Sequence, residues 1–247
     1  MTWEQVFNKL AKEETVHVGA EAFIGAKLKA KIGDVPFYNI MAAYVTEEGY
    51  KKEEVHTLAE LQEIVEREPA FIKCNTCGEI VDYDEGYWAD HETGRDYHDF
   101  ECLSKEMEQK HGFGAWRVIA YKSDVDIDDL EKMFEMSGEE YLEYEKHLKE
   151  EIGKRPVVVF DKLIFDSEDK LIGAEDGLWS QEQIDEMLEK CRIEIPFPNN
   201  EIIKAIQKTF LIRFEVCEKT GDTEGNIVNE WRDYDIEFVQ RCTCGWD

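Results

Sequence analysis

The chain has 247 residues, of which 43% are hydrophobic and 12% aromatic, so it can bury enough apolar surface to fold without disulfides. Lysine and arginine total 29 and aspartate and glutamate total 57, which gives a formal net charge of −28. A field of that sign repels phosphate backbones and argues against direct nucleic-acid binding. The apolar stretches are too short to span a bilayer and no apolar leader follows Met1, so we expect a cytoplasmic protein.

Four helix starts are predicted by pairs with capping-box spacing, in which each side chain satisfies the free backbone amide of the other residue. The pairs are Thr2 with Gln5, Thr57 with Glu60, Ser137 with Glu140, and Ser180 with Gln183. Apolar residues follow each pair at helical spacing. A fifth helix is expected to begin at Asn199 or Asn200, and a further short helix is suggested by Ile127, Leu130 and Phe134.

Strands are predicted where apolar residues alternate with polar ones or form short runs, over 116–121, 157–165, 210–217 and 234–238. We expect the last two to pair, because the segment 221–226 between them is polar and contains glycine. Helices and strands interleave without a regular βαβ order. The sequence therefore predicts an α+β fold with mainly antiparallel strands and an embedded small zinc finger.

A domain division is expected after residue 153, where Gly153 can end a helix and Pro156 prevents its continuation. The expected N-terminal α+β region, 1–153, contains a zinc finger at 71–106 and an acidic helical segment at 124–153. The expected C-terminal α+β region, 154–247, contains a β-hairpin.

The seven cysteines favour metal binding over disulfide bonding, because the chain shows no secretory signal. Cys74 and Cys77 are two residues apart and precede Gly78, so both sulfurs can converge on one ion about 2.3 Å away. A helix starting near His98 would place His98 and Cys102 on one face. We therefore predict one zinc ion bound by Cys74, Cys77, His98 and Cys102. Four protein ligands leave no open position for catalysis, which indicates a structural site.

Other assignments of these residues stay open at this point. The cysteines can be small buried side chains without a metal, or His91 can replace His98, although His91 has no cysteine at helical spacing. Cys242 and Cys244 can join Cys217 in a second metal site, but an accidental exposed pair is the simpler interpretation. Cys191 is expected to be a core residue on a helix.

The stretch from Cys74 to Cys102 resembles the single-zinc half of a LIM module or a related treble-clef finger. Such fingers combine a cysteine knuckle, a short hairpin carrying an aromatic residue, and a His-and-Cys pair at the next helix. Tyr87 and Trp88 stand where that aromatic residue is expected. The stretch departs from the LIM pattern because it lacks a second consecutive finger and has three residues between His98 and Cys102. The resemblance therefore implies a zinc site and not a LIM-like choice of partner.

The sequence carries no P-loop, no Gly-x-Ser-x-Gly and no His-Glu-x-x-His. Asp90 and His91 follow the Cys-x-x-Cys pair, an arrangement that is similar to that of the HNH nucleases. In those enzymes the DNA-cleaving histidine lies in a hairpin that a zinc ion stabilises. The second cysteine pair and the downstream Asn and His of that family are missing. We therefore expect no enzymatic activity and keep a metal-dependent nuclease of HNH type as a third hypothesis.

The negative charge is concentrated in two stretches. Eight acidic residues between Asp82 and Glu101 accompany one arginine, and twelve between Asp124 and Glu151 accompany three lysines. Repulsion between like charges on ordered structure lowers the stability of the fold, as for the i,i+4 pair of Glu139 and Glu143. We therefore expect the acidic residues of the two stretches to bind a partner with a basic surface. The candidate partner-binding residues are Asp82, Asp84, Glu85, Asp124, Asp126, Asp128, Asp129, Glu139, Glu140 and Glu143.

Carboxylates on rigid elements can occupy a basic groove by the electrostatics that bind phosphate. The preferred hypothesis is a non-enzymatic protein that binds and inhibits or regulates a nucleic-acid-binding protein by nucleic-acid mimicry. In acidity and compactness the chain resembles phage-encoded anti-defence proteins, such as antirestriction and anti-CRISPR factors, without a shared motif. The alternative is a zinc-stabilised adaptor for protein–protein interaction, whose acidic surface only confers solubility.

Overall fold

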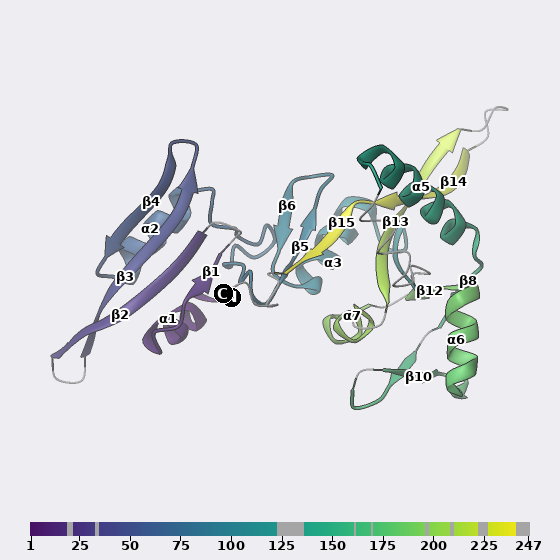
Figure 1. Cartoon of the computed structure of the whole chain (residues 1–247), viewed down its shortest axis with the longest axis horizontal. Helices are drawn as coiled ribbons and strands as arrows, with labels where there is room; N and C mark the ends of the chain where they lie inside the picture. Colours follow the sequence, from purple (N-terminus) through teal and green to yellow (C-terminus); the bar gives the residue numbers. More distant parts are fainter. Residues whose placement is uncertain are drawn as a thin grey trace. The chain divides into compact units, whose positions relative to one another are not determined.

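The computed structural model describes residues 1–18, 22–32, 35–122, 136–160, 162–168, 170–195, 198–207, 210–221 and 227–240. The chain forms two compact units, whose elements are labelled in Figure 1. Unit 1 comprises Met1–Glu106 together with the chain from Asp235 onward, and unit 2 comprises Met107–Tyr234. The division expected after residue 153 lies inside unit 2. The predicted α+β class is confirmed, because helices combine with mainly antiparallel sheets.

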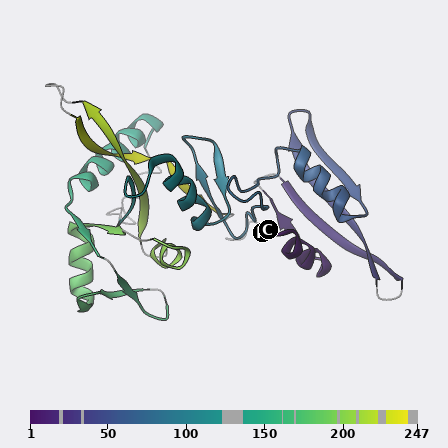
Figure 2. The ribbon, with the colours of Figure 1, turned by 180° about the vertical axis from the view of Figure 1, so that it is seen from behind.

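Unit 1 begins with a four-stranded antiparallel sheet of order β1-β2-β3-β4. Its elements are α1 (Trp3–Ala11), β1 (Val16–His17), β2 (Ala22–Ile32), β3 (Val35–Thr46), β4 (Gly49–Val55) and α2 (Leu58–Arg67). Both helices pack on one face of this sheet, as the two opposite views in Figures 1 and 2 show. Val6, Leu10, Leu61 and Val65 of the helices form a core with strand residues such as Tyr44.

The second part of unit 1 is a three-stranded antiparallel sheet of order β15-β5-β6. Its elements are β5 (Tyr87–Asp90), β6 (Arg95–Tyr97), α3 (Phe100–His111), which continues into unit 2, and β15 (Ile236–Val239). The pairing expected between 210–217 and 234–238 is therefore only partly correct. Tyr234 pairs with Phe214, whereas Phe238 pairs with Trp88 and its ring lies against the Trp88 indole.

Unit 2 contains a five-stranded sheet of order β14-β13-β7-β12-β8, in which only β12 and β8 are parallel, and a three-stranded sheet of order β11-β10-β9. Its strands are β7 (Trp116–Tyr121), β8 (Val157–Val159), β9 (Leu163–Phe165), β10 (Leu171–Ala174), β11 (Gly177–Leu178), β12 (Arg192–Ile195), β13 (Leu211–Gly221) and β14 (Ile227–Tyr234). Its helices are α5 (Gly138–Lys154), α6 (Gln181–Lys190) and α7 (Asn200–Gln207).

The predicted helix starts are confirmed where the structure describes them. All four capping boxes form with both hydrogen bonds, at the starts of α1, α2, α5 and α6. Asn199 caps α7, because its side-chain oxygen accepts a hydrogen bond from the Ile202 amide at 2.9 Å. The helix suggested by Ile127, Leu130 and Phe134 lies outside the described residues.

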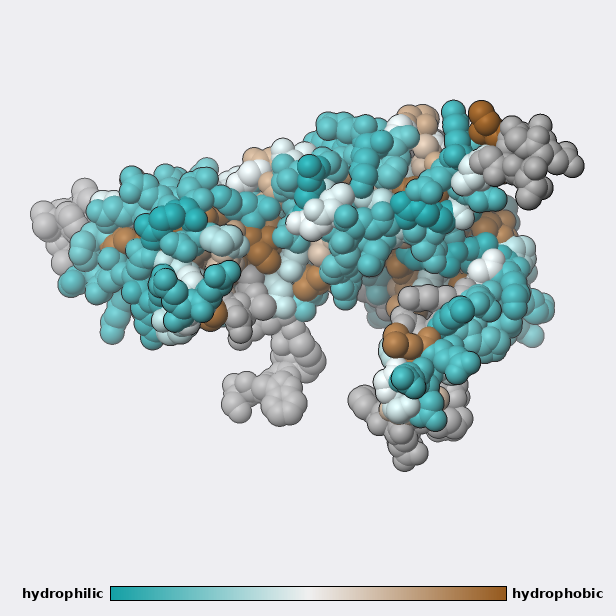
Figure 3. Space-filling view, turned by 90° about the horizontal axis from the view of Figure 1, so that it is seen from above, coloured by the Kyte–Doolittle hydropathy of each residue, from teal (hydrophilic) through white to brown (hydrophobic). Residues whose placement is uncertain are grey.

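Hydrophilic residues dominate the face displayed in Figure 3, where hydrophobic residues form separate patches. No helix within the described ranges combines the length and the apolar character that a membrane crossing requires.

Candidate metal centre

Cys74 and Cys77 lie on a tight turn that follows α2. The Gly78 amide donates a hydrogen bond to the Cys74 carbonyl at 2.8 Å, and the Cys74 amide donates to the Glu79 carbonyl at 2.8 Å. Lys73 and Ile80 close the turn with an isolated β-bridge. Gly78 has a φ of 75°, a conformation that side chains other than glycine rarely adopt. The turn therefore holds both thiols in the knuckle geometry expected from the sequence.

His98 and Cys102 come from the junction between β6 and α3. Cys102 lies in the first turn of the helix, but His98 precedes it, so the expected placement of both on one helical face is wrong. Asp99 is the reason, because its carboxylate accepts a hydrogen bond from the Cys102 amide at 2.7 Å and caps the helix one residue after His98. The cap still directs both side chains toward the knuckle.

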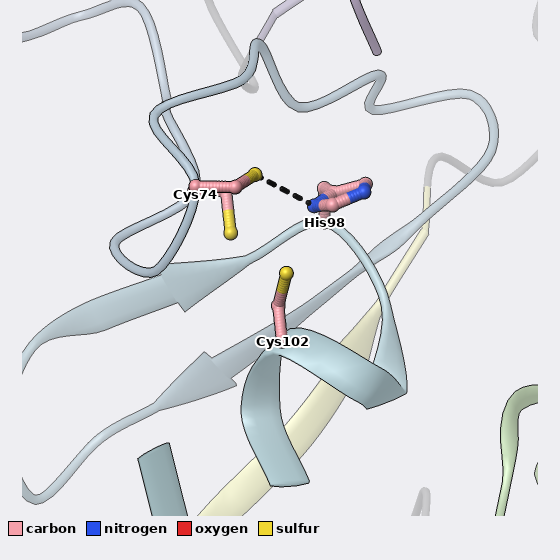
Figure 4. Close-up of side chains that lie close together, drawn as sticks. Cys74, His98 and Cys102 are labelled. Atoms are coloured by element: carbon pink, nitrogen blue, oxygen red, sulfur yellow. Dashed lines mark hydrogen bonds between the residues drawn. The ribbon is translucent and has the colours of Figure 1, made fainter. Parts of the chain in front are cut away.

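The structure brings Cys74, Cys77, His98 and Cys102 together, with one ligand atom from each and all four atoms within 4.8 Å of one another. Three of these side chains are labelled in Figure 4, where they point toward one region. A tetrahedral zinc ion would place its sulfur ligands about 3.8 Å apart, so binding needs only a small contraction. Cys74 and Cys102 are buried, whereas Cys77 is exposed. This group can therefore hold a metal ion close to the surface.

The thiols differ in protonation because their surroundings differ. Burial by itself raises the pKa of Cys74, but hydrogen bonds from the His98 side chain and from nearby backbone amides lower it to about 6. Burial raises the pKa of Cys77 and that of Cys102. The surrounding protein thus stabilises one thiolate well, and a dication at the centre would favour the deprotonated form of all three.

His98 is held between the thiols and two carboxylates. Its Nδ1 lies 3.4 Å from the Cys77 sulfur, while its Nε2 lies 3.0 Å from the Asp99 carboxylate and 3.7 Å from that of Glu79. A carboxylate behind a ligating histidine fixes the ring orientation and strengthens the ligand. No spacing in the sequence marks Asp99 or Glu79 for this role, although Asp99 directly follows His98.

An aromatic cluster is centred on Trp88 of β5, one of the two residues that the resemblance to zinc fingers singled out. The Trp88 ring makes an edge contact with Phe100 of α3 at 5.8 Å between centroids and lies 5.1 Å from the ring of Phe238. A Cβ atom added to Gly86 would come within 2.3 Å of the Phe238 ring. The hairpin, the helix and β15 are thus joined through Trp88.

The alternative ligands lie elsewhere or outside the described residues. The Nε2 atom of His91 is 3.1 Å from the Glu237 carboxylate, and His91 is not in the cysteine group. Asp90 is buried and accepts a hydrogen bond from the Thr93 amide. Cys191 lies at the end of α6 and Cys217 on β13, both partly buried. Cys242 and Cys244 lie outside the described residues.

The candidate partner-binding carboxylates have different surroundings. Asp82 is buried and paired with Lys9, so it cannot be part of an accessible acidic surface. Asp84 contacts His17 Nδ1 at 2.7 Å, and Glu85 is an exposed neighbour of Lys9. Glu139, Glu140 and Glu143 are exposed on α5. Asp124, Asp126, Asp128 and Asp129 lie outside the described residues.

No protein-family model matches the chain, and neither a curated protein nor a solved structure matches it. The chemistry of the centre is therefore inferred from its own donor set. Thiolate and imidazole ligands favour soft or borderline metals over magnesium or calcium, which prefer oxygen. A set of four protein ligands also fills a tetrahedral coordination sphere.

Proposed function

We propose that Cys74, Cys77, His98 and Cys102 bind one zinc ion that has a structural role. Three sulfurs and one imidazole nitrogen are a common ligand set for structural zinc, and four protein ligands leave no position for a substrate. The ion would connect the knuckle that follows α2 to the start of α3, where the Thr76 hydroxyl also donates a hydrogen bond to the Cys102 carbonyl at 3.0 Å.

Metal content measured by elemental analysis tests this part of the proposal. We expect one zinc per chain in the purified protein and a loss of zinc in Cys74→Ser and Cys102→Ser. Cys191→Ser and Cys217→Ser are matched controls, because both cysteines are partly buried and lie outside the metal group. A full zinc content in Cys102→Ser would contradict the proposed ligand set.

We propose that the chain acts without catalysis by binding a nucleic-acid-binding protein through exposed carboxylates, and that it inhibits or regulates this partner by nucleic-acid mimicry. One observation carries the proposal, namely the exposed acidic start of α5. Glu139 and Glu143 lie one turn apart, and neither has an ion pair among the described residues. Like charges at this spacing destabilise an isolated helix by a few tenths of a kcal/mol, and binding to a basic groove would reverse that cost.

The helix can present these groups because it is only lightly packed. Ile152 is the buried residue among its described side chains, whereas Glu139, Glu140 and Glu143 are exposed. The capping box of Ser137 and Glu140 fixes the start of the helix and therefore the direction of its first turn. A rigid, exposed and acidic helix end is what recognition by a cationic groove requires.

The test is affinity capture from an extract of the native host, with the full zinc-loaded chain as bait. We expect a nucleic-acid-binding protein that is released by raised salt and by a DNA oligonucleotide, because both compete for the same basic surface. The variant Glu139→Gln/Glu143→Gln should lose this partner. Glu182→Gln/Glu189→Gln changes two exposed glutamates of α6 and should retain it.

A zinc-stabilised adaptor is the second candidate, because apolar side chains accompany the acidic ones on α5. Tyr141 and Leu142 are exposed, Leu142 at 63%. An adaptor that uses this apolar surface should lose its partner in Leu142→Ala and keep it in Glu139→Gln/Glu143→Gln. Capture that resists salt and oligonucleotide would favour the adaptor over the mimic.

A further inference from the structure

The hairpin of β13 and β14 forms one edge of the five-stranded sheet in unit 2. Among the strands that the structure describes, β14 is the outer strand and pairs with β13 alone. The pairing of β13 with β7 ends at Val216, whereas the pairing of β13 with β14 continues to Gly221. The end of the hairpin is therefore a ribbon of two strands, which projects from the rest of unit 2 in Figures 1 and 2.

The outer edge of β14 is open to a further strand. Ile227 is 76% exposed and Trp231 is 40% exposed, so the described chain leaves this strand largely uncovered. An edge strand presents a row of backbone N–H and C=O groups to which another strand can bind. A ribbon of two strands is only marginally stable in water, so a third strand would stabilise it.

The charges on β14 are not balanced within the chain. Glu230 lies directly opposite Glu218 of β13, and like charges at opposite positions destabilise a sheet. Arg232 forms an ion pair with Glu218, whereas Glu230 forms none with the residues that the structure describes. A cation beside Glu230, on the outer side of β14, would relieve the repulsion.

A second copy of the chain can supply that cation. Two copies that join at β14 about a twofold axis have antiparallel strands, and the same face of both sheets lies on the same side. Because side chains alternate along a strand, each residue then opposes a residue of its own face. A pairing centred on Trp231 meets this condition and places Glu230 opposite the partner's Arg232 twice. Centring the pairing on Glu230 or on Arg232 would instead place like charges opposite each other at the axis.

The pairing centred on Trp231 also brings the two Trp231 rings together. Each indole is held by Arg117, whose guanidinium lies 4.0 Å from the ring centroid. Trp231 pairs with Cys217 across the hairpin, which fixes its place along the ribbon. Aromatic pairs at opposite positions stabilise a sheet, so two partly exposed indoles favour the same register as the charges do.

We propose that two copies of the chain form a twofold dimer in which their β14 strands pair antiparallel in the register centred on Trp231. The net charge of −28 on each copy opposes association at low salt. Salt of about 0.15 M screens charges that lie further apart than about 8 Å, whereas the Glu230 and Arg232 pairs are in contact and are screened less. The inference is independent of the proposed zinc site and of the proposed partner.

Sedimentation velocity of the zinc-loaded chain in about 0.15 M salt tests the proposal. We expect the chain to pass from monomer to dimer as its concentration rises to about 0.1 mM. The dimer should weaken when the salt is lowered, because the repulsion between the two copies is then less screened. A wild-type chain that stays monomeric over this range would overturn the proposal.

Charge reversal locates the dimer contact at β14. Glu230→Arg and Arg232→Glu each place like charges opposite each other and should weaken dimerisation by about 10-fold or more. An equimolar mixture of the two variants should dimerise again, because every cross-strand pair then combines opposite charges. Misfolding of either variant cannot produce this recovery. A mixture that stays monomeric would overturn the proposed register.

Two further measurements separate the dimer contact from effects on charge and folding. Glu182→Arg makes the same change in net charge at an exposed position of α6, and it should not weaken dimerisation. At a concentration where the wild-type chain is monomeric, Glu230→Arg should melt at the same or a higher temperature. The reason is that the substitution replaces the like-charge pair with Glu218 by a pair of opposite charges. Equal weakening of the dimer by Glu182→Arg would overturn the proposed contact.

Discussion

Asp99 serves the helix and the metal centre at the same time. One carboxylate oxygen accepts the Cys102 amide at 2.7 Å, and the other lies 3.0 Å from Nε2 of His98. The residue therefore fixes the position of one ligand and the ring orientation of another. Its contribution to the cap and its contribution to the metal can be separated, because asparagine caps helices as well as aspartate does.

We predict that Asp99→Asn lowers zinc affinity by about 10- to 100-fold while α3 stays folded, since removing the carboxylate behind a ligating histidine has effects of that size. Competition with a chromophoric chelator measures the affinity, and far-ultraviolet circular dichroism measures the helix. Asp185→Asn, on α6 and outside the cysteine and histidine group, should leave the affinity unchanged. An Asp99→Asn protein with wild-type affinity would show that His98 does not depend on this carboxylate.

Glu215 is a second residue whose surroundings determine its behaviour. It is 3% exposed in the five-stranded sheet and accepts hydrogen bonds from Arg117 at 2.8 Å, Arg213 at 3.1 Å and Arg192 at 3.2 Å. Burial by itself raises the pKa of Glu215, but the hydrogen bonds and charges of Arg213 and Arg117 outweigh it and lower the pKa overall. The sequence shows only a polar position between apolar ones and gives no sign of this network.

The Glu215 carboxylate has a lower pKa in the folded state than in the unfolded chain, so it stabilises the fold above about pH 4.3, the ordinary glutamate value. That stabilisation is lost as the pH falls through the lower folded pKa. We predict that Glu215→Gln lowers the free energy of unfolding by about 3–5 kcal/mol at pH 7, because three arginines lose the buried carboxylate that they share. Arg117 keeps Glu194 and Arg213 keeps Asp233. The difference from wild type should shrink below about pH 4.

Urea unfolding at a series of pH values measures this difference. Glu194→Gln is the control, because Arg117, at 2.7 Å, is the one ion-pair partner of Glu194 among the described residues. Glu194 is also more exposed, so its loss should cost less. A Glu215→Gln protein whose deficit stays constant from pH 7 to pH 3 would contradict the assigned carboxylate.

At the scale of elements, local signals were predictable from the sequence and distant pairings were not. Each capping box involves residues three positions apart, so Thr57 with Glu60 indicates a helix start without reference to the rest of the fold. The partner of 236–239 is β5, almost 150 residues earlier, as the pairing of Phe238 with Trp88 shows. Alternation shows that a segment is a strand but does not specify its neighbour.

We predict that Gly86→Ala releases β15 from the hairpin of the metal centre. Gly86 has a φ of 89°, and an added Cβ would come within 2.3 Å of the Phe238 ring. The positive φ costs an alanine about 1–2 kcal/mol, and the displaced ring adds roughly 1–3 kcal/mol. Hydrogen exchange should show lost protection of the amides that join β5 and β15.

Gly94→Ala is the matched control for this prediction. Gly94 lies in the turn of the same hairpin with a φ of 67°, but nothing lies within 4 Å of its added Cβ. It should therefore show only the cost of the positive φ and keep β15 protected. Equal destabilisation by the two variants would mean that contact with Phe238 does not restrict Gly86.

For the molecule as a whole, the group of cysteines and histidine was predictable because cysteine spacing is a local signal. A cleft of about 550 Å³ that crosses β2, β3 and β4 was not predictable. Cys74 and Cys77 are recognisable from the sequence, and His98 and Cys102 follow in the next stretch of the chain. The cleft depends on the register of three strands, which brings Gly25, Asn39 and Lys52 together. No spacing in the sequence encodes that register.

Metal binding would be coupled to net charge through the acidic stretch that contains His98. Eight acidic residues and one arginine lie between Asp82 and Glu101, so a dication bound there would reduce local repulsion. Structural zinc contributes roughly 10–16 kcal/mol to the folding of finger peptides, which is comparable with the stability of about 5–15 kcal/mol of a whole domain.

We predict that chelation removes the hydrogen-exchange protection of residues 71–106 and 236–239 while the β13–β14 pairing of unit 2 stays protected. Added salt should restore part of the lost protection, because it screens the carboxylates that the ion no longer neutralises. Full protection after chelation would show that the ion does not support this part of the fold.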